Sequence, residues 1–263
     1  GQPRIHTDKE GNPNRVICPI TVLRGIRDAG DNIRQLKYDR PIIMSGNPAM
    51  IEEMAKWKEN DMVEVKGAVT TKDINKRTKC KECGHVNISK GNVVFINPIY
   101  ADVRETGITK EEGQKLLKKR CEISNVVVLI GKLCRDPEYI YTPRGTLVTQ
   151  YQLAVNRKFH IKEDAPNIRT DYPWVKSFGD IARMDAKVLS TGSMVLIDGA
   201  IQTRSIERRT ACESCGAEYS WNDSAFEVIP YAVEYLQDYK LPEEVAAEEE
   251  KLNKEAIKSV FDD

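Results

Sequence analysis

The chain has 263 residues, its 40 lysines and arginines balance 40 acidic side chains, and 40% of its residues are hydrophobic. No run reaches the roughly 18 apolar residues of a membrane span and no secretory leader pattern is present, so we expect a soluble, cytoplasmic protein that uses no membrane. The length favours two domains. With three histidines and no phosphate-binding glycine-rich loop, the sequence favours binding over catalysis.

The charge is unevenly distributed along the chain. Residues 237–263 contain nine acidic side chains and four lysines, so this tail carries −5 and residues 1–236 carry +5. A basic body suits contact with phosphate groups, and an acidic tail stays in solvent.

An internal repeat relates the two halves of the chain. The segment Met62–Lys72 recurs 132 residues later as Met194–Arg204. At the same offset, Thr78, Cys80, Cys83, Gly84 and Pro98 match Thr210, Cys212, Cys215, Gly216 and Pro230. No gap is needed from about 42 to 98, so we interpret the halves as one duplicated unit.

Each copy is expected to contain five strands and one short helix. In the first copy we expect strands at Arg15–Ile26, Ile33–Tyr38, 40–45, Met62–Lys72 and Val93–Val103, and a helix at 48–58. In the second copy we expect strands at Asn125–Leu133, Leu147–Phe159, 171–178, Met194–Arg204 and Phe226–Leu236, and a helix at 180–189. This order is typical of the five-stranded Greek-key barrel called the OB-fold.

The predicted fold class is therefore all-β with short helices: two tandem OB-fold barrels and a C-terminal helix. The expected domains are an N-terminal barrel at 1–103, a helical linker at 104–122, a C-terminal barrel at 123–237 and an acidic helical tail at 238–263. In the tail, an apolar stripe suits the groove of a protein partner, although a solvated terminal helix explains the tail equally well. The stripe comprises Val245, Leu252, Ile257 and Phe261.

Four of the seven cysteines form two Cys-x-x-Cys-Gly motifs, Cys80–Gly84 and Cys212–Gly216. A structural Zn²⁺ ion takes four ligands, and each motif offers two thiolates, so the simplest site combines both motifs around one ion. His85 as an alternative ligand, pairing with a second chain and redox-active dithiols are the other interpretations. Cys18, Cys121 and Cys134 lie in or beside apolar segments and are expected to be buried.

The third strand of the second copy has aromatic residues at every other position. Because side chains alternate between faces, Tyr172, Trp174, Lys176 and Phe178 are expected to share one face of the strand. Such a row can stack nucleic-acid bases of any sequence. The opposing interpretation, a buried aromatic core, is weakened by Lys176. Four basic residues are candidates for phosphate contacts: Arg135, Arg157, Lys158 and Arg204.

The first copy has Arg40, Ile42, Met44 and Gly46 at the corresponding positions and so lacks the aromatic row. Its barrel either binds the backbone weakly or serves a structural and pairing role, and the second role is favoured. The alternative to nucleic-acid binding is an adaptor or assembly module of a replication or conjugation complex, which binds protein instead of DNA.

The second copy resembles the bacterial single-stranded DNA-binding proteins. The matching stretches are Asn125–Leu133, Arg135–Glu138 with Tyr141, Leu153–Ala154, Phe178–Gly179 and Gly192–Gly199 followed by Thr203–Arg204. The resemblance implies a barrel whose aromatic and basic residues bind single-stranded DNA during replication, recombination or DNA transfer.

By position, the resemblance places Phe159 and Tyr172 where the family has stacking tryptophans, Phe178 where it has a stacking phenylalanine, and Arg204 at a basic position. Ile206 stands where a further tryptophan is expected. The family's four-barrel assemblies imply a homodimer of this two-barrel chain. Single-stranded RNA is also a possible ligand, because stacking does not distinguish the two sugars.

Overall fold

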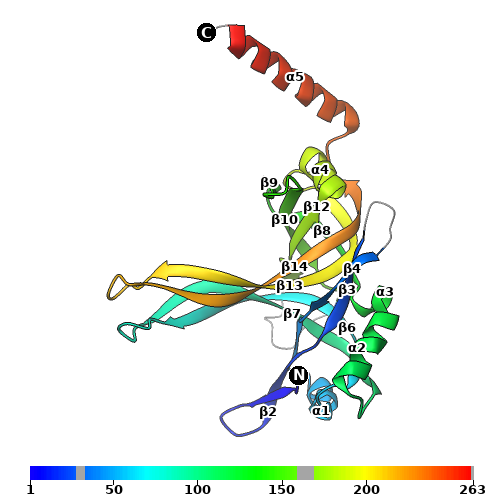
Figure 1. The fold of residues 1–263 in the computed structure, drawn as a ribbon, viewed down its shortest axis with the longest axis vertical. Helices are drawn as coiled ribbons and strands as arrows, with labels where there is room; N and C mark the ends of the chain where they lie inside the picture. The colour runs from blue at the N-terminus through cyan, green and yellow to red at the C-terminus, as the bar shows by residue number, and fades with distance from the viewer. Residues whose placement is uncertain (28–32, 159–168, 262–263) are drawn as a thin grey trace. The chain divides into compact units, whose positions relative to one another are not determined.

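The computed structural model describes residues 1–27, 33–158 and 169–261, which are mostly strands (Figure 1). Gly1–Val127, Asn156–Pro173 and Ala200–Val228 form one compact unit, the arm unit. Val128–Val155, Trp174–Gly199 and Ile229–Asp263 form a second, the barrel unit. Within the described ranges, no helix has the length and apolar character needed to cross a membrane.

Five strands that lie wholly or partly in the barrel unit close into a ring. They are β8 (Val127–Leu133), β10 (Leu147–Asn156), β12 (Trp174–Phe178), β13 (Met194–Ala211) and β14 (Glu218–Gln237). The sheet order is β10-β12-β14-β13-β8, and a further pairing of Leu153 with Leu133 joins β10 to β8. Helix α4 (Gly179–Val188) lies between β12 and β13 in the chain. This topology is that of the OB-fold and confirms the predicted fold class.

Shorter elements flank the ring along the chain. Strand β9 (Glu138–Tyr141) pairs with β10 through a turn, β11 (Thr170–Asp171) precedes β12, and α5 (Pro242–Phe261) follows β14. The core is made by the inward side of each strand, because successive side chains point to opposite faces. Its fully buried members include Tyr151, Leu153, Val175, Val195 and Ile197.

A carboxyl group is buried beside this core. Asp185 of α4 has no exposed surface and accepts hydrogen bonds from the hydroxyls of Tyr151 at 3.3 Å and Tyr235 at 2.8 Å. Burial raises the pKa of Asp185 above its ordinary value, and the hydrogen bonds from Ser177 and the two tyrosines only partly offset this. Folding therefore favours the protonated carboxyl group.

This raised pKa predicts a pH dependence of stability. Because the folded Asp185 binds its proton more tightly than the unfolded one, its contribution to the unfolding free energy is present below the unfolded pKa of about 3.9 and is lost as pH rises through the folded pKa. We expect urea unfolding at several pH values to show a smaller loss of stability with rising pH in Asp185→Asn than in the wild type. Parallel curves would contradict this.

The arm unit contains a second sheet with the same connectivity. Its strands are β1 (Arg4–Thr7), β2 (Pro13–Pro19), β5 (Ile42–Ser45), β6 (Met62–Lys79) and β7 (Val86–Glu105). The order β1-β2-β5-β7-β6, with β5 parallel to β7, repeats the order β8-β10-β12-β14-β13 of the closed ring. The duplicated OB topology predicted from the sequence is therefore present in both copies.

Helix α1 (Pro48–Ala55) lies between β5 and β6 in the chain, as α4 does between β12 and β13. It starts at Pro48 because the side chain of Asn47 accepts a hydrogen bond from the amide of Ala49. Its residues Ile51 and Met54 pack in a core cluster that also contains Val16, Cys18, Ile43, Trp57 and Ala101. Helices α2 (Lys110–Lys119) and α3 (Cys121–Ser124) follow β7 and contain most of the predicted linker.

The first copy departs from the predicted strands in one region. The predicted strand Arg15–Ile26 is divided into two strands, β2 and β3 (Val22–Arg27). The unpredicted strand β1 takes the first position in the barrel order, so β2 takes the second. Strand β4 (Ile33–Asp39) covers the predicted Ile33–Tyr38 but pairs with β3 in a separate two-stranded sheet. The β3–β4 hairpin is an insertion, and a continuous β-branched run in the sequence does not reveal the change of sheet.

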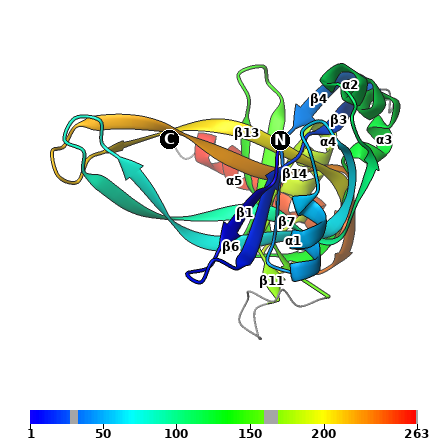
Figure 2. The ribbon, with the colours of Figure 1, turned by 90° about the horizontal axis from the view of Figure 1, so that it is seen from below.

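The second copy departs from the prediction at Pro173. The predicted strand 171–178 is divided into β11 and β12, because proline has no amide to donate to a neighbouring strand. Strands β6, β7, β13 and β14 continue well past their predicted ends. Their distal parts form two long hairpins, the first arm (72–93) and the second arm (204–225), which Figure 2 shows from below.

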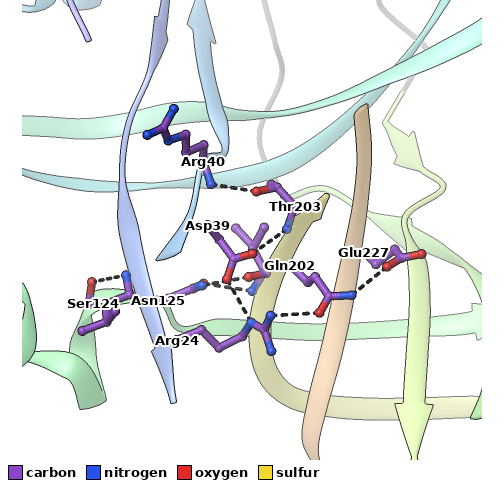
Figure 3. Close-up of polar contacts among 10 residues, drawn as sticks. Arg24, Asp39, Arg40, Ser124, Asn125, Gln202, Thr203 and Glu227 are labelled. Atoms are coloured by element: carbon purple, nitrogen blue, oxygen red, sulfur yellow. Dashed lines mark hydrogen bonds and ion pairs between the residues drawn. The ribbon is translucent and has the colours of Figure 1, made fainter. Parts of the chain in front are cut away.

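A buried carboxylate on β4 links the two copies within the arm unit (Figure 3). Asp39 is 2% exposed, and its Oδ2 pairs with the Arg24 guanidinium at 2.9 Å. Its Oδ1 accepts the backbone amide of Thr203 at 2.7 Å, and the Thr203 hydroxyl accepts the amide of Arg40 at 2.7 Å. Arg24 also donates to Gln202 at 2.8 Å. The end of the β3–β4 hairpin at which Val22 pairs with Asp39 is thereby attached to β13.

The reciprocal contact is made by Asp171, Thr71 and Tyr172, each 132 positions from its counterpart, together with Arg157, which is 133 positions from Arg24. Asp171 pairs with Arg157 at 2.5 Å, and its Oδ1 accepts the amide of Thr71 at 2.7 Å. The Thr71 hydroxyl accepts the amide of Tyr172 at 2.9 Å. Each copy therefore contributes an aspartate that holds the fourth barrel strand of the other, which explains why both aspartates are buried.

Removing the charge of Asp39 is expected to destabilise the arm unit. Asp39→Asn leaves the Arg24 guanidinium buried without its counter-ion, which typically costs about 3–5 kcal/mol of unfolding free energy. Asp102→Asn is the matched control, because the Asp102–Arg104 pair is exposed and such pairs contribute about 0–1 kcal/mol. Urea unfolding measures both, and equal effects would contradict a role for the buried pair.

Candidate nucleic-acid interface and metal centre

The aromatic row of β12 lies on the outer face of the closed ring in the barrel unit. Val175 and Ser177 are fully buried, whereas Trp174 and Lys176 are half-buried and Phe178 is 40% exposed. This alternation confirms that Trp174, Lys176 and Phe178 share a face that the core does not occupy.

Strand β10 supplies the neighbouring positions of that face. Cross-strand pairing places Gln152 opposite Trp174, Gln150 opposite Lys176, and Val148 opposite Phe178. Residues directly opposite each other in an antiparallel pair lie on the same side of the sheet. The two glutamines are partly exposed, so amide groups lie beside the aromatic row. We call the set Trp174, Lys176, Phe178, Gln150 and Gln152 the aromatic face.

A cation stands over one ring of this face. The Arg135 guanidinium carbon is 4.6 Å from the centre of the Trp174 ring, which is within the range of a cation–π contact. Arg135 follows β8 in the chain and its side chain is exposed. The contact positions Trp174 and brings positive charge to the aromatic row.

Sequence reasoning missed the glutamines and one apolar neighbour. Ile140 of β9 lies opposite Val148 and is 62% exposed, so β9 extends the same side of the sheet. The signal for Ile140 was the turn Thr142–Gly145, which joins β9 to β10 as a hairpin. Tyr139 and Tyr141 are also exposed, but they alternate onto the opposite side of β9.

Three further predicted site residues lie in the arm unit. Tyr172 is 45% exposed, with its backbone held by Thr71. Lys158 is exposed. Arg157 is buried in its ion pair with Asp171, which is a correction, because a guanidinium enclosed in this way is not presented to a phosphate. Its positive charge, which suggested a phosphate contact, did not reveal the buried partner.

Arg204 is the fourth predicted residue in the arm unit. Its Nε and Nη2 both donate to the Glu227 carboxylate, at 3.1 and 2.7 Å, and this pairing raises the pKa of Arg204. Its charge is therefore largely compensated. Phe159 lies outside the described residues.

The four motif cysteines meet where the two arms end. Each motif forms the same small turn: the amide of Cys80 donates to His85 and that of Gly84 to Cys80, while the amide of Cys212 donates to Ala217 and that of Gly216 to Cys212. Gly84 and Gly216 have φ of 74° and 72°, which favours glycine. Both turns therefore present their thiols in the same way.

The sulfur atoms form a compact cluster that fits one metal ion. All four Sγ atoms lie within 4.8 Å of one another, with Cys80 and Cys215 at 3.9 Å and Cys83 and Cys212 at 3.6 Å. Four sulfurs about 2.3 Å from a tetrahedral ion lie roughly 3.8 Å apart, whereas a disulfide bond measures about 2.05 Å. The observed distances therefore match a metal centre and not a disulfide.

Within the cluster, the pKa values of Cys212 and Cys215 are shifted in opposite directions. Backbone hydrogen bonds from Cys215 and Ser214 lower the pKa of Cys212 to about 6. The amide of Ala217 lowers the pKa of Cys215, but contacts with Cys83, Cys212 and Cys80 and partial desolvation outweigh it and raise that pKa to about 12. Thiols that share protons in this way release them to a bound cation.

Comparison with known proteins identifies the family. The model of the single-strand binding protein family matches residues 124–219. A single-stranded DNA-binding protein of Clostridium tetani is 44% identical over 86 residues, which are 32% of this chain and 57% of that protein. One of Thermotoga maritima is 33% identical over 130 residues, which are 49% of this chain and 84% of that protein. The chain belongs to the single-strand binding protein family.

The family match is concentrated in the second copy. The chain spans about half the length of the relatives from Clostridium tetani and Oceanobacillus iheyensis, at 57% and 50%. A solved structure of the wild-type single-stranded DNA-binding protein of Thermus aquaticus aligns with 91% of this chain and 89% of its own, with a TM-score of 0.55 and 18% identity. This likeness extends the shared fold over both copies.

Proposed function

We propose that the chain binds single-stranded DNA, without catalysis, through the aromatic face of the barrel unit. The observation that carries this proposal is the row of Trp174, Lys176 and Phe178 on a strand whose other side fills the core. Each stacked base contributes on the order of 1–3 kcal/mol and requires no particular sequence. The relatives from Clostridium tetani and Thermotoga maritima carry the name single-stranded DNA-binding protein, which supports the same activity.

Predicted residues of each unit are proposed as further contacts. In the barrel unit, Arg135 is an exposed cation suited to the phosphate backbone. In the arm unit, Lys158 is an exposed cation and Tyr172 an exposed ring, and each is proposed as a contact of that unit by itself. Gln150 and Gln152 offer hydrogen bonds to base edges. Because stacking does not distinguish a sugar with a 2′-hydroxyl from one without it, single-stranded RNA is the second candidate ligand of this face. The cellular role that we propose is protection or organisation of unwound DNA in replication, recombination or DNA transfer.

Binding assays with labelled oligonucleotides test the proposal. We expect the full chain to bind dT and mixed-sequence single strands similarly, to bind a duplex of equal length much less tightly, and to lose affinity as salt rises. Absence of binding to single strands at low salt would refute the proposal and favour an adaptor that binds protein.

We further propose that the cysteine cluster holds one structural Zn²⁺ ion. The support is the tetrahedral spacing of Cys80, Cys83, Cys212 and Cys215 and the all-sulfur donor set, which Zn²⁺ favours. Four protein ligands leave no open position, so the ion would join the two arms and would not activate water.

Our proposal for the organisation of the chain keeps the sequence boundaries: barrels at 1–103 and 123–237, a linker at 104–122 and a tail at 238–263. A homodimer is proposed because β8 exposes Val128 and Ile130 on its outer side, and covering such a face is favourable. The molar mass in solution, compared with 29.8 kDa for one chain, tests it. The α5 tail remains a candidate for a protein partner.

A further inference from the structure

The first arm is a two-stranded ribbon whose two faces have different surroundings. On one face, Thr78 and Asn87 hydrogen-bond the Tyr219 hydroxyl at 2.8 and 2.5 Å, and Lys76 pairs with Asp223 at 2.7 Å. This face packs on the second arm. The other face is formed by the alternate positions and points away from those contacts.

The outward positions of the first arm are exposed and basic. Cross-strand pairing aligns Lys79 with Val86, Arg77 with Ile88, Asn75 with Lys90, and Asp73 with Asn92. All eight side chains are exposed, and none of the described residues forms an ion pair with Arg77, Lys79 or Lys90. Three cations and one acid give this outer face a net charge of +2.

The second arm is an internal comparison, because it arose from the same repeat. At the equivalent positions it has Ala211 for Lys79, Arg209 for Arg77, Asn222 for Lys90, Glu207 for Asn75 and Glu218 for Val86. The one cation among these equivalent positions, Arg209, pairs with Glu207 at 2.8 Å. One cation and two acids give −1 where the first arm has +2. The shared fold of the arms therefore does not require the basic residues.

We propose that the outer face of the first arm, formed by Arg77, Lys79 and Lys90 with the apolar Val86 and Ile88, is a second contact surface for single-stranded nucleic acid. The inference rests on the proposed function of the aromatic face. The polyanionic backbone is the ligand whose charge complements three unpaired cations on one ribbon face. The face has no aromatic ring, so it binds phosphates and does not stack bases.

This proposal gives the first copy a role in binding that its barrel strand does not provide. The positions equivalent to Trp174 and Phe178 are Ile42 and Gly46, so stacking on β5 is absent. Electrostatic contact through the arm needs no such ring. It also predicts that the two sites differ in kind: stacking in one and salt-sensitive backbone binding in the other.

The test is the triple substitution Arg77→Ala/Lys79→Ala/Lys90→Ala in the full chain, with a labelled dT of about 60 nucleotides, several times the 4–16 nucleotides covered by one barrel. Each phosphate contact to a single strand contributes about 0.7 to the slope of log affinity against log salt, so losing three lowers the slope by about 2. At about 0.1 M salt we expect binding on the order of 10- to 100-fold weaker.

The second arm provides the matched control. Arg209→Ala removes a cation at an equivalent position, but one that is already paired, so affinity and salt slope are expected to stay at the wild-type values. An unchanged salt slope in the triple variant, while the wild type still binds single strands, would overturn the arm proposal and leave the aromatic face intact. Failure of the wild type to bind would overturn both.

Discussion

Replacing both rings of the aromatic face, Trp174→Ala/Phe178→Ala, is expected to abolish tight binding to single-stranded DNA. If each ring stacks one base, the double substitution removes about 2–6 kcal/mol, so affinity falls by at least about 30-fold. Because both side chains lie outside the core, the thermal stability of the protein is expected to change little. Fluorescence anisotropy with a dT oligonucleotide at fixed salt measures the affinity, and thermal unfolding checks the fold.

Tyr141→Ala is the matched control for this experiment. Tyr141 is an exposed aromatic residue of the same unit, but it lies on the other side of β9 from the aromatic face. Its removal is expected to leave affinity within about twofold of the wild type, an effect below 0.5 kcal/mol, as for ordinary surface substitutions. If the double variant binds as the wild type does, the aromatic face is not the binding surface.

The two substitutions also separate stacking from charge. The aromatic variant retains Lys176, Arg135 and the basic outer face of the first arm, so its residual binding is expected to remain salt-dependent. The arm variant retains the rings, so it is expected to keep the salt-insensitive part of the affinity. If the arm variant still prefers single strands to duplex DNA and the aromatic variant does not, stacking is assigned to the aromatic face.

Loss of one cysteine from the cluster is expected to remove the metal and destabilise the arms. Cys212→Ser leaves three thiolates, and we expect zinc content to fall from about one ion per chain to near zero. Because the ion would hold the two arm ends together, the melting temperature is expected to fall by about 2–4 °C for each kcal/mol lost. Metal analysis and thermal unfolding measure the two effects.

Cys134→Ser is the control for the cluster. Contrary to the expectation from sequence, Cys134 is exposed, and it lies in the barrel unit, outside the four-cysteine cluster. Its replacement is expected to leave zinc content and melting temperature unchanged. Chelation of the wild type is expected to reproduce the Cys212→Ser melting curve. A wild type purified with zinc in the buffer but containing no stoichiometric metal would contradict the metal proposal.

The sequence alone determined the features that depend on local pattern. The 132-residue repeat predicted that both copies share one topology, and the order β1-β2-β5-β7-β6 against β8-β10-β12-β14-β13 confirms it. Period-two alternation predicted that Tyr172, Trp174, Lys176 and Phe178 share a face, because strand geometry fixes the side of each residue. The burial pattern of β12 confirms this for the last three, whereas Tyr172 lies before Pro173 and outside that strand. Spacing of the cysteine pairs predicted that they converge, because each tight turn presents two thiols together.

Only the tertiary structure decided the features that depend on distant partners. The break between β2 and β3 follows from β3 pairing with β4, and the burial of Arg157 follows from Asp171, neither of which has a local signal. The reciprocal contacts of Asp39 with Thr203 and of Asp171 with Thr71 join residues 164 and 100 positions apart. From the sequence alone, an acidic residue is expected to be exposed to solvent, because its burial depends on which cation and which amide the fold brings to it.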